Sequence, residues 1–254
     1  MQQNFRFSFL SGNVIKILAA IFMAIDHIGL VFWPQNMVLF ALGRLSMPLF
    51  AFMIAEGAHY TKNKLKYIAL IFLLGSCCQV VLYIVEQSFY LGILITFSIS
   101  IATIYSLQYF KKKLFSGKAI EKICSLLIFV GCIVLSFFLN EWFEIDYGFW
   151  GCMLPVFASI LRIDNLSYKG DGWWNRQSKL LNGVPINLLT FSIGLILLCV
   201  FCRDKIGIIQ FYSLLSLPIL FLYSGRRGKL KLKYFFYVFY PVHLAIIYGI
   251  SMLI

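Results

Sequence analysis

Long apolar runs recur along the whole chain, and they restrict its fold more than any other feature. An α-helix needs roughly 20 apolar residues to cross the hydrocarbon core of a bilayer. Charged or Gly/Pro-rich breaks separate nine runs of about this length, at 14–33, 36–58, 66–86, 91–110, 121–139, 147–161, 184–202, 206–223 and 234–254. The run 147–161 is short for a simple crossing, so ten helices is the alternative count. The pattern predicts an all-α, polytopic bundle of about nine transmembrane helices.

The composition excludes several other classes of protein. Apolar residues make up 61% of the 254 residues and charged residues only 13%, whereas a soluble domain has about half and about a quarter. Nine helices of about 20 residues use about 180 residues, and the remainder is too short for a soluble catalytic domain. The seven cysteines lie almost all inside apolar runs, as small buried residues do. A soluble enzyme, a DNA-binding module and a secreted disulfide scaffold are therefore excluded.

The net charge of +12 is explained by membrane topology. If the N-terminus is cytoplasmic, all 22 Lys and Arg residues except Arg44, Arg203 and Lys205 fall on the cytoplasmic side. Cytoplasmic loops of membrane proteins carry such an excess of Lys and Arg. We therefore predict a cytoplasmic N-terminus and a lipid bilayer as the environment of the chain. The basic charge requires no nucleic acid, and none is expected as a partner.

Ionisable residues inside the first two runs need a partner or a function, because a charged side chain near the bilayer centre costs about 2.5–3.5 kcal/mol. Asp26 and His27 precede the turn at Pro34 by eight and seven residues, and Arg44 follows Gln35 by nine. Two antiparallel helices joined by this turn would place all three side chains at one depth, where Asp26 and Arg44 can pair. The pair either only fixes the register of the helices or supports a functional His27.

The three histidines are candidates for different roles. An imidazole beside a carboxylate is a common arrangement for a general base, which favours His27. Adjacent residues on a helix point about 100° apart, so the group that orients His27 can also come from another span. His243 lies near mid-membrane in the last run, and His59 lies at the cytoplasmic end of the second run, close to Glu56. Because these levels differ, no metal site is predicted.

Lys16 enters the first run from the cytoplasmic side, 11 residues before His27. At 1.5 Å per residue the two positions are about 16 Å apart, which is half of the hydrocarbon thickness. A ligand with phosphates near Lys16 would therefore need a long, thin arm to reach His27. Pantetheine is such an arm.

Five motifs follow one another from about Lys16 to the C-terminus. They are KILAAIFMAIDHIG, GRLSMPLFAFMIAEGAHYTKN, DYGFWG, LYSGRRGKLK and FFYVFYPVHL. In this order they resemble the TraX family, bacterial membrane proteins named after a conjugative-pilus protein that acetylates the N-terminus of pilin. That family is similar to the wider group of polytopic membrane acyltransferases, in which an Arg-x10-His pattern marks the first span. Lys16 and His27 occupy the matching positions here, with Lys in place of Arg.

The resemblance implies one transmembrane acyltransferase-like domain over 1–254, in the bacterial cytoplasmic membrane. Such a protein moves an acetyl group from cytoplasmic acetyl-CoA, the expected acyl-CoA, to a hydroxyl or amine of a membrane-associated or extracytoplasmic peptide, sugar or lipid. His27 takes the catalytic role as general base, with Asp26 and Arg44 as its supporting pair and His243 as the next candidate. The residues expected to bind acetyl-CoA are Lys16, Glu56, His59, Lys62, Arg226, Arg227 and Lys229. An acyl-histidine intermediate is the alternative to direct transfer.

A small-molecule transporter or flippase is the competing prediction, because buried Asp, Arg and His side chains also bind anionic solutes or relay protons. Against it, the sequence has no inverted repeat and no Gly-broken helices paired between its halves. A non-catalytic assembly factor or sensor is a third class, and such a protein would tolerate the loss of His27. An oligomer is compatible with the sequence in each case.

Overall fold

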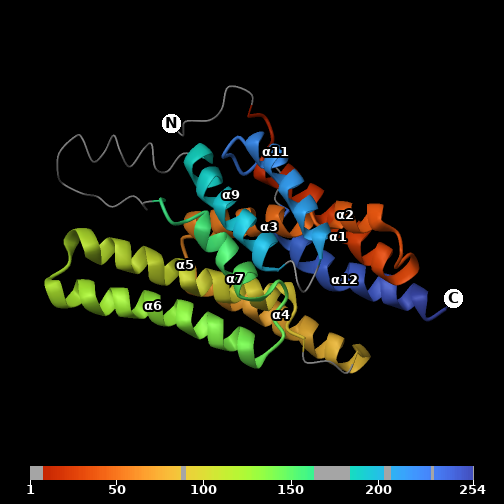
Figure 1. Cartoon of the computed structure of the whole chain (residues 1–254), viewed down its shortest axis with the longest axis horizontal. Coiled ribbons are helices and arrows are strands. Elements are labelled where there is room, and N and C mark those ends of the chain that lie inside the picture. The colour runs from red at the N-terminus through yellow and green to blue at the C-terminus, as the bar shows by residue number, and fades with distance from the viewer. Residues whose placement is uncertain (1–7, 87–89, 163–183, 203–206, 230–231, 254) are drawn as a thin grey trace. The chain divides into compact units, whose positions relative to one another are not determined.

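Helices form all of the regular structure in the computed structural model of the chain, which describes residues 8–86, 90–162, 184–202, 207–229 and 232–253 (Figure 1). The helices are α1 (Gly12–Phe32), α2 (Met37–Gly43), α3 (Ser46–Tyr60), α4 (Lys64–Glu86), α5 (Ile93–Ser116), α6 (Ala119–Trp142), α7 (Gly148–Phe157), α9 (Val184–Phe201), the 3₁₀ helix η1 (Ile208–Leu215), α11 (Ser216–Phe221) and α12 (Lys233–Ser251). Over these ranges the β-structure is limited to two isolated bridges. The predicted all-α fold class is confirmed.

Each predicted apolar run forms helix, but the runs differ in length and continuity. Five segments are long and apolar enough to cross a membrane, namely Gly12–Phe32, Met37–Tyr60, Ile93–Leu114, Ala119–Trp142 and Val184–Phe201. Three apolar helices are shorter, namely Gly148–Phe157, Ile208–Phe221 and Phe235–Ser251. The count of nine crossings stays a prediction. So does the cytoplasmic N-terminus. Arg203 and Lys205, the two cations expected on the outer side, lie outside the described residues.

The chain divides into two compact units, and each is described by itself. Unit 1 holds Ile54–Gly194, and unit 2 holds the described parts of Asn4–Met53 and Leu195–Ile254. The chain therefore passes from unit 2 to unit 1 inside α3 and returns inside α9. The single domain over 1–254 stays a prediction.

In unit 1, α5 packs against α4, α6 and α7. Small side chains with hydroxyl groups are buried along α5, at Thr96, Ser98, Ser100, Thr103 and Ser106. Most of them bond to carbonyls of their own helix, and Ser100 Oγ also donates to Cys152 O in α7 at 2.7 Å. Small residues allow helices to approach closely, and their hydroxyls need no water when the helix supplies the acceptor.

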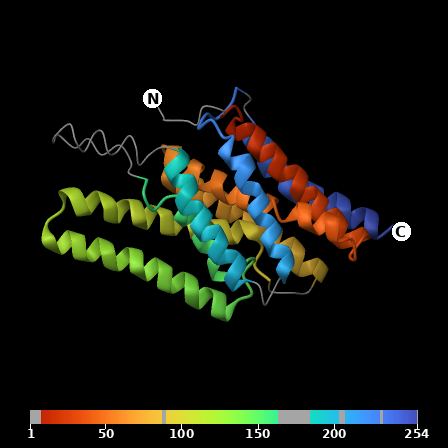
Figure 2. The same ribbon diagram turned by 45° about the horizontal axis from the view of Figure 1, so that its top comes forward.

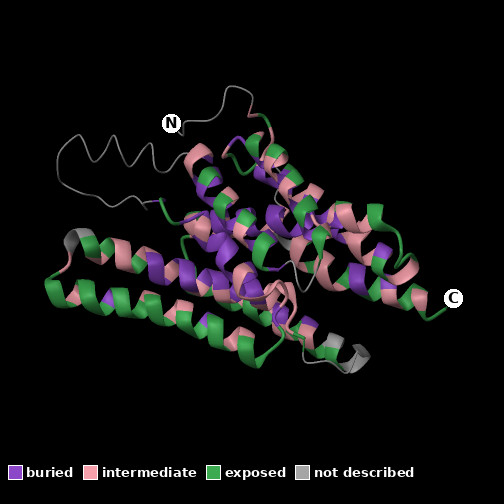
Figure 3. Cartoon of the chain, in the orientation of Figure 1, coloured by how far each residue is buried: buried purple, intermediate pink, exposed green. Residues whose placement is uncertain are grey.

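Helix α6 covers one side of α5 and leaves most of its own surface exposed (Figure 3). Its only buried described residues are Ser125 and Ser136, while large apolar side chains such as Leu127 are 64% exposed. A helix on the surface of a soluble protein instead buries its apolar side chains and exposes its polar ones. An exposed apolar surface that runs the length of a helix suits contact with lipid. The apolar helices are thus compatible with a multi-pass membrane protein.

In unit 2, α1 packs against both α2 and α12 (Figure 2). The turn 33–36 joins α1 to α2, and Asn36 caps α2 by accepting hydrogen bonds from the N–H groups of Val38 and Leu39. The two helices approach so closely that a Cβ at Gly29 would lie 2.9 Å from Leu39 Cβ. Hence α1 and α2 form the antiparallel hairpin that the sequence predicts.

Helices α1 and α12 run parallel. Lys16 Nζ lies 5.9 Å from the ring centroid of Phe236, and the rings of His27 and His243 are 5.1 Å apart. Residue numbers therefore rise together along both helices. If both helices span a membrane, they cross it in the same direction, which requires an odd number of crossings.

Candidate functional site

The predicted ion pair of Asp26 and Arg44 is present in unit 2. Arg44 Nη2 donates to Asp26 Oδ1 at 2.8 Å and to Asp26 Oδ2 at 3.1 Å. The side chains of Arg44 and Asp26 are 14% and 21% exposed. Two opposite charges in such a partly buried place stabilise each other through charge-assisted hydrogen bonds. The pair links Arg44, the residue directly after α2, to Asp26 in the second half of α1.

Gly43 is the residue that allows this pair to form, and the sequence did not single it out. Helix α2 ends at Gly43, and Arg44 follows as its C-cap. A Cβ at position 43 would overlap the carboxylate of Asp26. The signal in the sequence is the Gly-Arg dipeptide, in which Gly43 makes room for the carboxylate and Arg44 supplies its partner.

His27 and His243 meet across α1 and α12, with their ring centroids 5.1 Å apart and their planes at 76°. His243 also stacks on Phe239 at 4.8 Å and is 7% exposed. The expectation that all three histidines lie at separate levels is therefore wrong for this pair. The error arises because the depths of residues in distant spans depend on helix ends and tilts that a sequence does not give. Within the described residues no group of three His, Cys, Asp or Glu could hold a metal ion.

The hydrogen bonds of the two imidazoles define their tautomers. His27 Nδ1 lies 2.8 Å from Met23 O, and His243 Nδ1 lies 2.8 Å from Phe239 O. A carbonyl only accepts, so Nδ1 carries the hydrogen in both neutral rings and Nε2 carries the lone pair. The backbone of α1 thus orients His27, whereas both carboxylate oxygens of Asp26 are turned to Arg44.

Lys16 lies on the same face of α1 as His27, because 11 residues correspond to about three helical turns. Both side chains contact α12, Lys16 through Phe236 and His27 through His243. The α1–α12 seam, defined by these four residues, therefore has a basic group at one end and an imidazole pair further along. This is the arrangement that the spacing of Lys16 and His27 predicts.

The segment 222–229 holds the start of α1 through its backbone. Gly12 N donates to Arg226 O at 2.8 Å, and Asn13 N donates to Arg227 O at 3.0 Å. These carbonyls use N–H groups that a helix N-terminus otherwise offers to an anion. The side chains of Arg226, Arg227 and Lys229 remain exposed, so an anion here would meet side chains and not the helix end.

The other candidates for acetyl-CoA binding, Glu56, His59 and Lys62, lie in unit 1. Glu56 is 5% exposed and forms an ion pair with Arg162, which is 4% exposed. The guanidinium of Arg162 lies 5.0 Å over the ring of Tyr60, which His59 also contacts. Glu56 is therefore neutralised inside unit 1 by a partner that the sequence assigned to a cytoplasmic loop. Lys62 is exposed between α3 and α4.

Lys111 lies beside the Glu56–Arg162 ion pair of unit 1 and binds the backbone next to it. Its Nζ donates to Ser159 O at 2.6 Å and to Arg162 O at 2.8 Å. A lysine that binds the carbonyls beyond a helix C-terminus satisfies groups that would otherwise be unpaired. Arg162 and Lys111 thus form contacts inside unit 1. The charge asymmetry of the sequence indicates only the side of the membrane on which they lie, and does not reveal these contacts.

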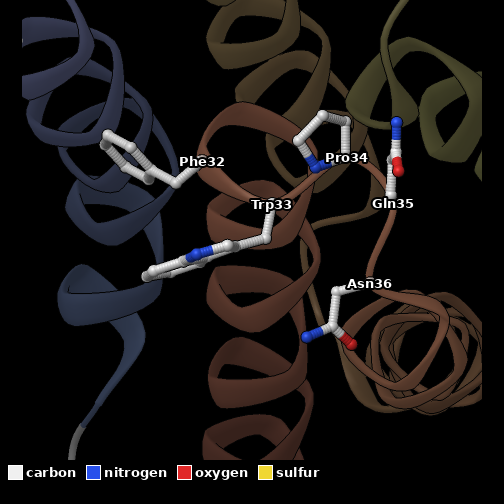
Figure 4. Close-up of a pocket in the computed structure, with 5 residues that line it drawn as sticks. All are labelled: Phe32, Trp33, Pro34, Gln35 and Asn36. Carbon is white, nitrogen blue, oxygen red and sulfur yellow. The ribbon is translucent and has the colours of Figure 1, made fainter.

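A pocket of about 480 Å³ opens at the turn between α1 and α2 (Figure 4). It is lined by Phe32, Trp33, Pro34, Gln35 and Asn36. The lining combines two aromatic rings with two carboxamides and carries no charge. The sequence predicts a turn here but not a pocket, because the hollow depends on how the turn folds.

Comparisons with known proteins cover nearly the whole chain. The family model described as TraX protein matches residues 11–251. A protein of Dichelobacter nodosus, described as probable fimbrial assembly protein FimC, serogroup H1, is 26% identical over 276 residues, which cover 99% of each chain. An uncharacterised protein of Rickettsia prowazekii is 41% identical over 56 residues, or 22% of each chain. No solved structure matches. Because the family match includes every candidate site residue, the resemblance seen in the motifs is confirmed, and the chain belongs to the TraX family.

Proposed function

We propose that this protein is an integral membrane acetyltransferase of the bacterial cytoplasmic membrane. It moves an acetyl group from cytoplasmic acetyl-CoA to a hydroxyl or amine of a membrane-associated or extracytoplasmic acceptor. The observation that carries the proposal is the α1–α12 seam. There a cation and an imidazole lie on one face of α1, separated by about three helical turns, or about 16 Å.

The basic end of the seam supports the binding of coenzyme A. Lys16 and the exposed side chains of Arg226, Arg227 and Lys229 belong to segments joined at the start of α1. Fixed cations attract phosphate groups, and the exposed Arg side chains can bind them in a fork. With its phosphates there, the pantetheine arm extends along the seam toward His27.

His27 supplies the base in this proposal. Its Nε2 takes the proton of the acceptor hydroxyl or amine, and the acceptor atom attacks the thioester carbonyl. The tetrahedral intermediate then expels the CoA thiolate, which takes the proton back from Nε2. General base catalysis of this kind is typically worth about 10²–10⁴-fold. The Asp26–Arg44 pair holds α2 against α1 and so fixes the position of His27.

The acceptor is a peptide, a sugar or a lipid. The relative in Dichelobacter nodosus is described as a probable fimbrial assembly protein, which favours an acceptor on a surface fibre or its subunits. The bilayer is the second partner, and the proposal holds for a monomer or an oligomer. Glu56 is already neutralised by Arg162 and so gives no support to a transporter, which becomes an outcome of the test below.

Calorimetry of purified protein with acetyl-CoA tests the proposal. We expect saturable binding by the wild type, weaker binding by Lys16→Ala and by Arg226→Ala/Arg227→Ala, and retained binding by His27→Ala. His27→Ala should also lose the release of free CoA, measured with a thiol reagent. Lys118→Ala, which removes an exposed lysine outside the site, is the matched control and should bind as the wild type does.

A folded wild type that binds no acetyl-CoA at high micromolar concentration would contradict the proposal. A screen for transported anions would then test the competing function. Binding that is insensitive to both Lys16→Ala and Arg226→Ala/Arg227→Ala would show that the phosphates bind elsewhere, and the seam would lose its role.

A further inference from the structure

We propose that the pocket at the turn between α1 and α2 binds a neutral oligosaccharide, and that a hydroxyl of this oligosaccharide accepts the acetyl group. The proposal rests on the proposed acetyl transfer and names the class of its acceptor. The pocket is lined by Phe32, Trp33, Pro34, Gln35 and Asn36. It holds about 480 Å³, which lies within the range of about 300–1,000 Å³ for small-molecule sites.

The lining combines the two kinds of group that bind a sugar. A sugar ring has C–H groups on its faces and hydroxyl groups around its rim. Phe32 and Trp33 provide aromatic rings, with centroids 6.1 Å apart, and the negative faces of such rings attract C–H groups. Trp33 is 58% exposed, so a ligand can reach its indole. The carboxamides of Gln35 and Asn36 donate and accept hydrogen bonds, as hydroxyl groups also do.

The neutral lining favours a sugar over the other classes of acceptor. The five residues that line the pocket include no acid and no base. A peptide amine is an ammonium group before it reacts, and it binds best beside a carboxylate. A phosphorylated lipid binds best beside a cation. A neutral sugar needs neither partner, and its hydroxyl groups pair with carboxamides.

The turn is ordered before any ligand binds. Asn36 N donates to Trp33 O at 2.9 Å, and Pro34 occupies the position of a tight turn that proline favours. Asn36 Oδ1 accepts from the N–H groups of Val38 and Leu39, which fixes the carboxamide and leaves Nδ2 to donate (Figure 4). A site whose groups are already ordered loses less entropy when it binds.

Membrane anchoring is the other role of a tryptophan at a helix end, because Trp rings settle at the interface of a bilayer. Trp142 is the comparison, since it ends α6 and is 72% exposed. An anchor requires only the amphipathic ring. Trp33 in addition lines a hollow together with two carboxamides, and this combination favours a ligand.

The pocket lies near the proposed base. Trp33 follows His27 by six residues, which corresponds to about 9 Å along α1. The sugar ring held at the turn is therefore not the one that is acetylated, and linked sugars cover the distance. The reacting hydroxyl gives its proton to His27 Nε2 while its oxygen bonds to the thioester carbonyl carbon. The C–S bond then breaks, the CoA thiolate takes the proton, and an O-acetyl sugar remains.

Titration calorimetry of the full chain in lipid nanodiscs tests the site. The probes are cellotriose, maltotriose, mannotriose and triacetylchitotriose, which are neutral and differ in linkage and stereochemistry. Lipids and detergents with sugar headgroups are left out, because they would compete. Ring stacking and carboxamide contacts tolerate such differences, so at least one probe should bind with a Kd below about 10 mM. With acetyl-CoA present, that probe should become an acetyl ester, detected by mass spectrometry.

Two variants separate the pocket from other sites. Trp33→Ala removes the indole and should weaken binding of the probe about tenfold or more. Asn36→Asp keeps the cap of α2, because Asp caps a helix as well as Asn does, but it lacks the Nδ2 donor and should weaken binding about tenfold. Trp142→Ala is the matched control and should bind the probe as the wild type does. Thermal unfolding of each variant confirms that it is folded.

A folded wild type that binds none of the four probes would overturn the inference. Equal affinity of Trp33→Ala and the wild type would overturn it too, because the sugar would then bind elsewhere. A peptide with a free N-terminal amine that binds in place of the sugars, and is lost in Trp33→Ala, would assign the pocket to a peptide instead. These results leave the proposed acetyl transfer intact as long as the wild type binds acetyl-CoA. A wild type that binds a probe but no acetyl-CoA would keep the pocket and remove the proposed transfer.

Discussion

At the scale of single residues, glycine and charge work together around Asp26. The carboxylate occupies the volume that a side chain at position 43 would need, and Arg44 neutralises it from the next position. Without the pair, a charge inside a hydrocarbon layer would cost about 2.5–3.5 kcal/mol. The Gly-Arg dipeptide therefore allows α2 to approach α1 closely beside Asp26, the neighbour of His27 in the sequence.

Gly43→Ala is expected to lower stability by about 1–3 kcal/mol, because the added methyl group overlaps the carboxylate and forces a shift. The measurement is the Tm of purified protein in detergent, followed with a thiol-reactive dye. Gly131→Ala is the control, since no atom in the described part of the chain lies within 4 Å of a Cβ at that position of α6. It should raise stability slightly, by up to about 1 kcal/mol. Equal effects of the two changes would contradict the close approach of Asp26.

At the scale of elements, the segment 222–229 is shaped for its contact with α1. Gly228 has φ +94°, in the left-handed region that favours glycine, and a Cβ there would lie 2.8 Å from Ser11 Oγ. The segment thus follows the first turn of α1 closely. It carries the exposed cations proposed to bind phosphates, and under that proposal its docking on α1 would affect the affinity for acetyl-CoA.

Gly228→Ala should raise the Kd for acetyl-CoA several-fold, because the segment must move away from α1 and carries Arg226, Arg227 and Lys229 with it. Titration calorimetry measures the change. Gly207→Ala is matched to it, since Gly207 also has a positive φ of 80° but no atom of the described residues lies within 4 Å of a Cβ there. That control should lose stability only, by about 1–2 kcal/mol. An unchanged Kd in Gly228→Ala would separate the segment from the binding site.

The 3₁₀ helix η1 is a second element with an unusual feature. Gln210 is 0% exposed, and neither atom of its carboxamide has a hydrogen-bond partner among the described residues. Gln210→Met keeps the length of the side chain and removes the unpaired groups, so we expect stability to rise by about 1–3 kcal/mol. The Tm reports it.

Gln108→Met is the comparison for Gln210→Met, because Gln108 accepts a hydrogen bond from Lys64 Nζ at 2.5 Å. It should be neutral or slightly destabilising. A fall in Tm with Gln210→Met would mean that a water molecule already pairs the amide.

At the scale of the whole molecule, the direction of the first and last helices bears on topology. Helices α1 and α12 run parallel, so both cross a membrane in the same sense if both span it. The positive-inside rule then predicts that the N-terminus and the segment 222–229 are cytoplasmic and that the C-terminus is outside. In the proposed function, this topology would let acetyl-CoA reach Lys16 from the cytoplasm, where it is made.

Reporter fusions test this topology. Alkaline phosphatase fused after Ile254 should be active and green fluorescent protein at the same point should be dark, because the C-terminus is predicted to be extracytoplasmic. Fusions after Lys229 are the internal control and should give the reverse pair of signals. A fluorescent fusion after Ile254 would require an even number of crossings and would contradict the parallel arrangement within a membrane.

The sequence by itself determined the features that depend on neighbours along the chain. Runs of apolar residues dictate helices, because each helix satisfies its own backbone and needs only an apolar surrounding. The pairing of Asp26 with Arg44 could be predicted for the same reason, since one short turn leaves two antiparallel helices little freedom in register.

Only the tertiary structure decided which distant residues meet. His27 and His243 come from opposite ends of the chain, and Glu56 and Arg162 are 106 residues apart. Nearly every helix here is apolar on most of its surface, so periodicity does not indicate which face meets which neighbour. Close packing between particular helices makes that choice, and with it the partner of each buried charge and imidazole.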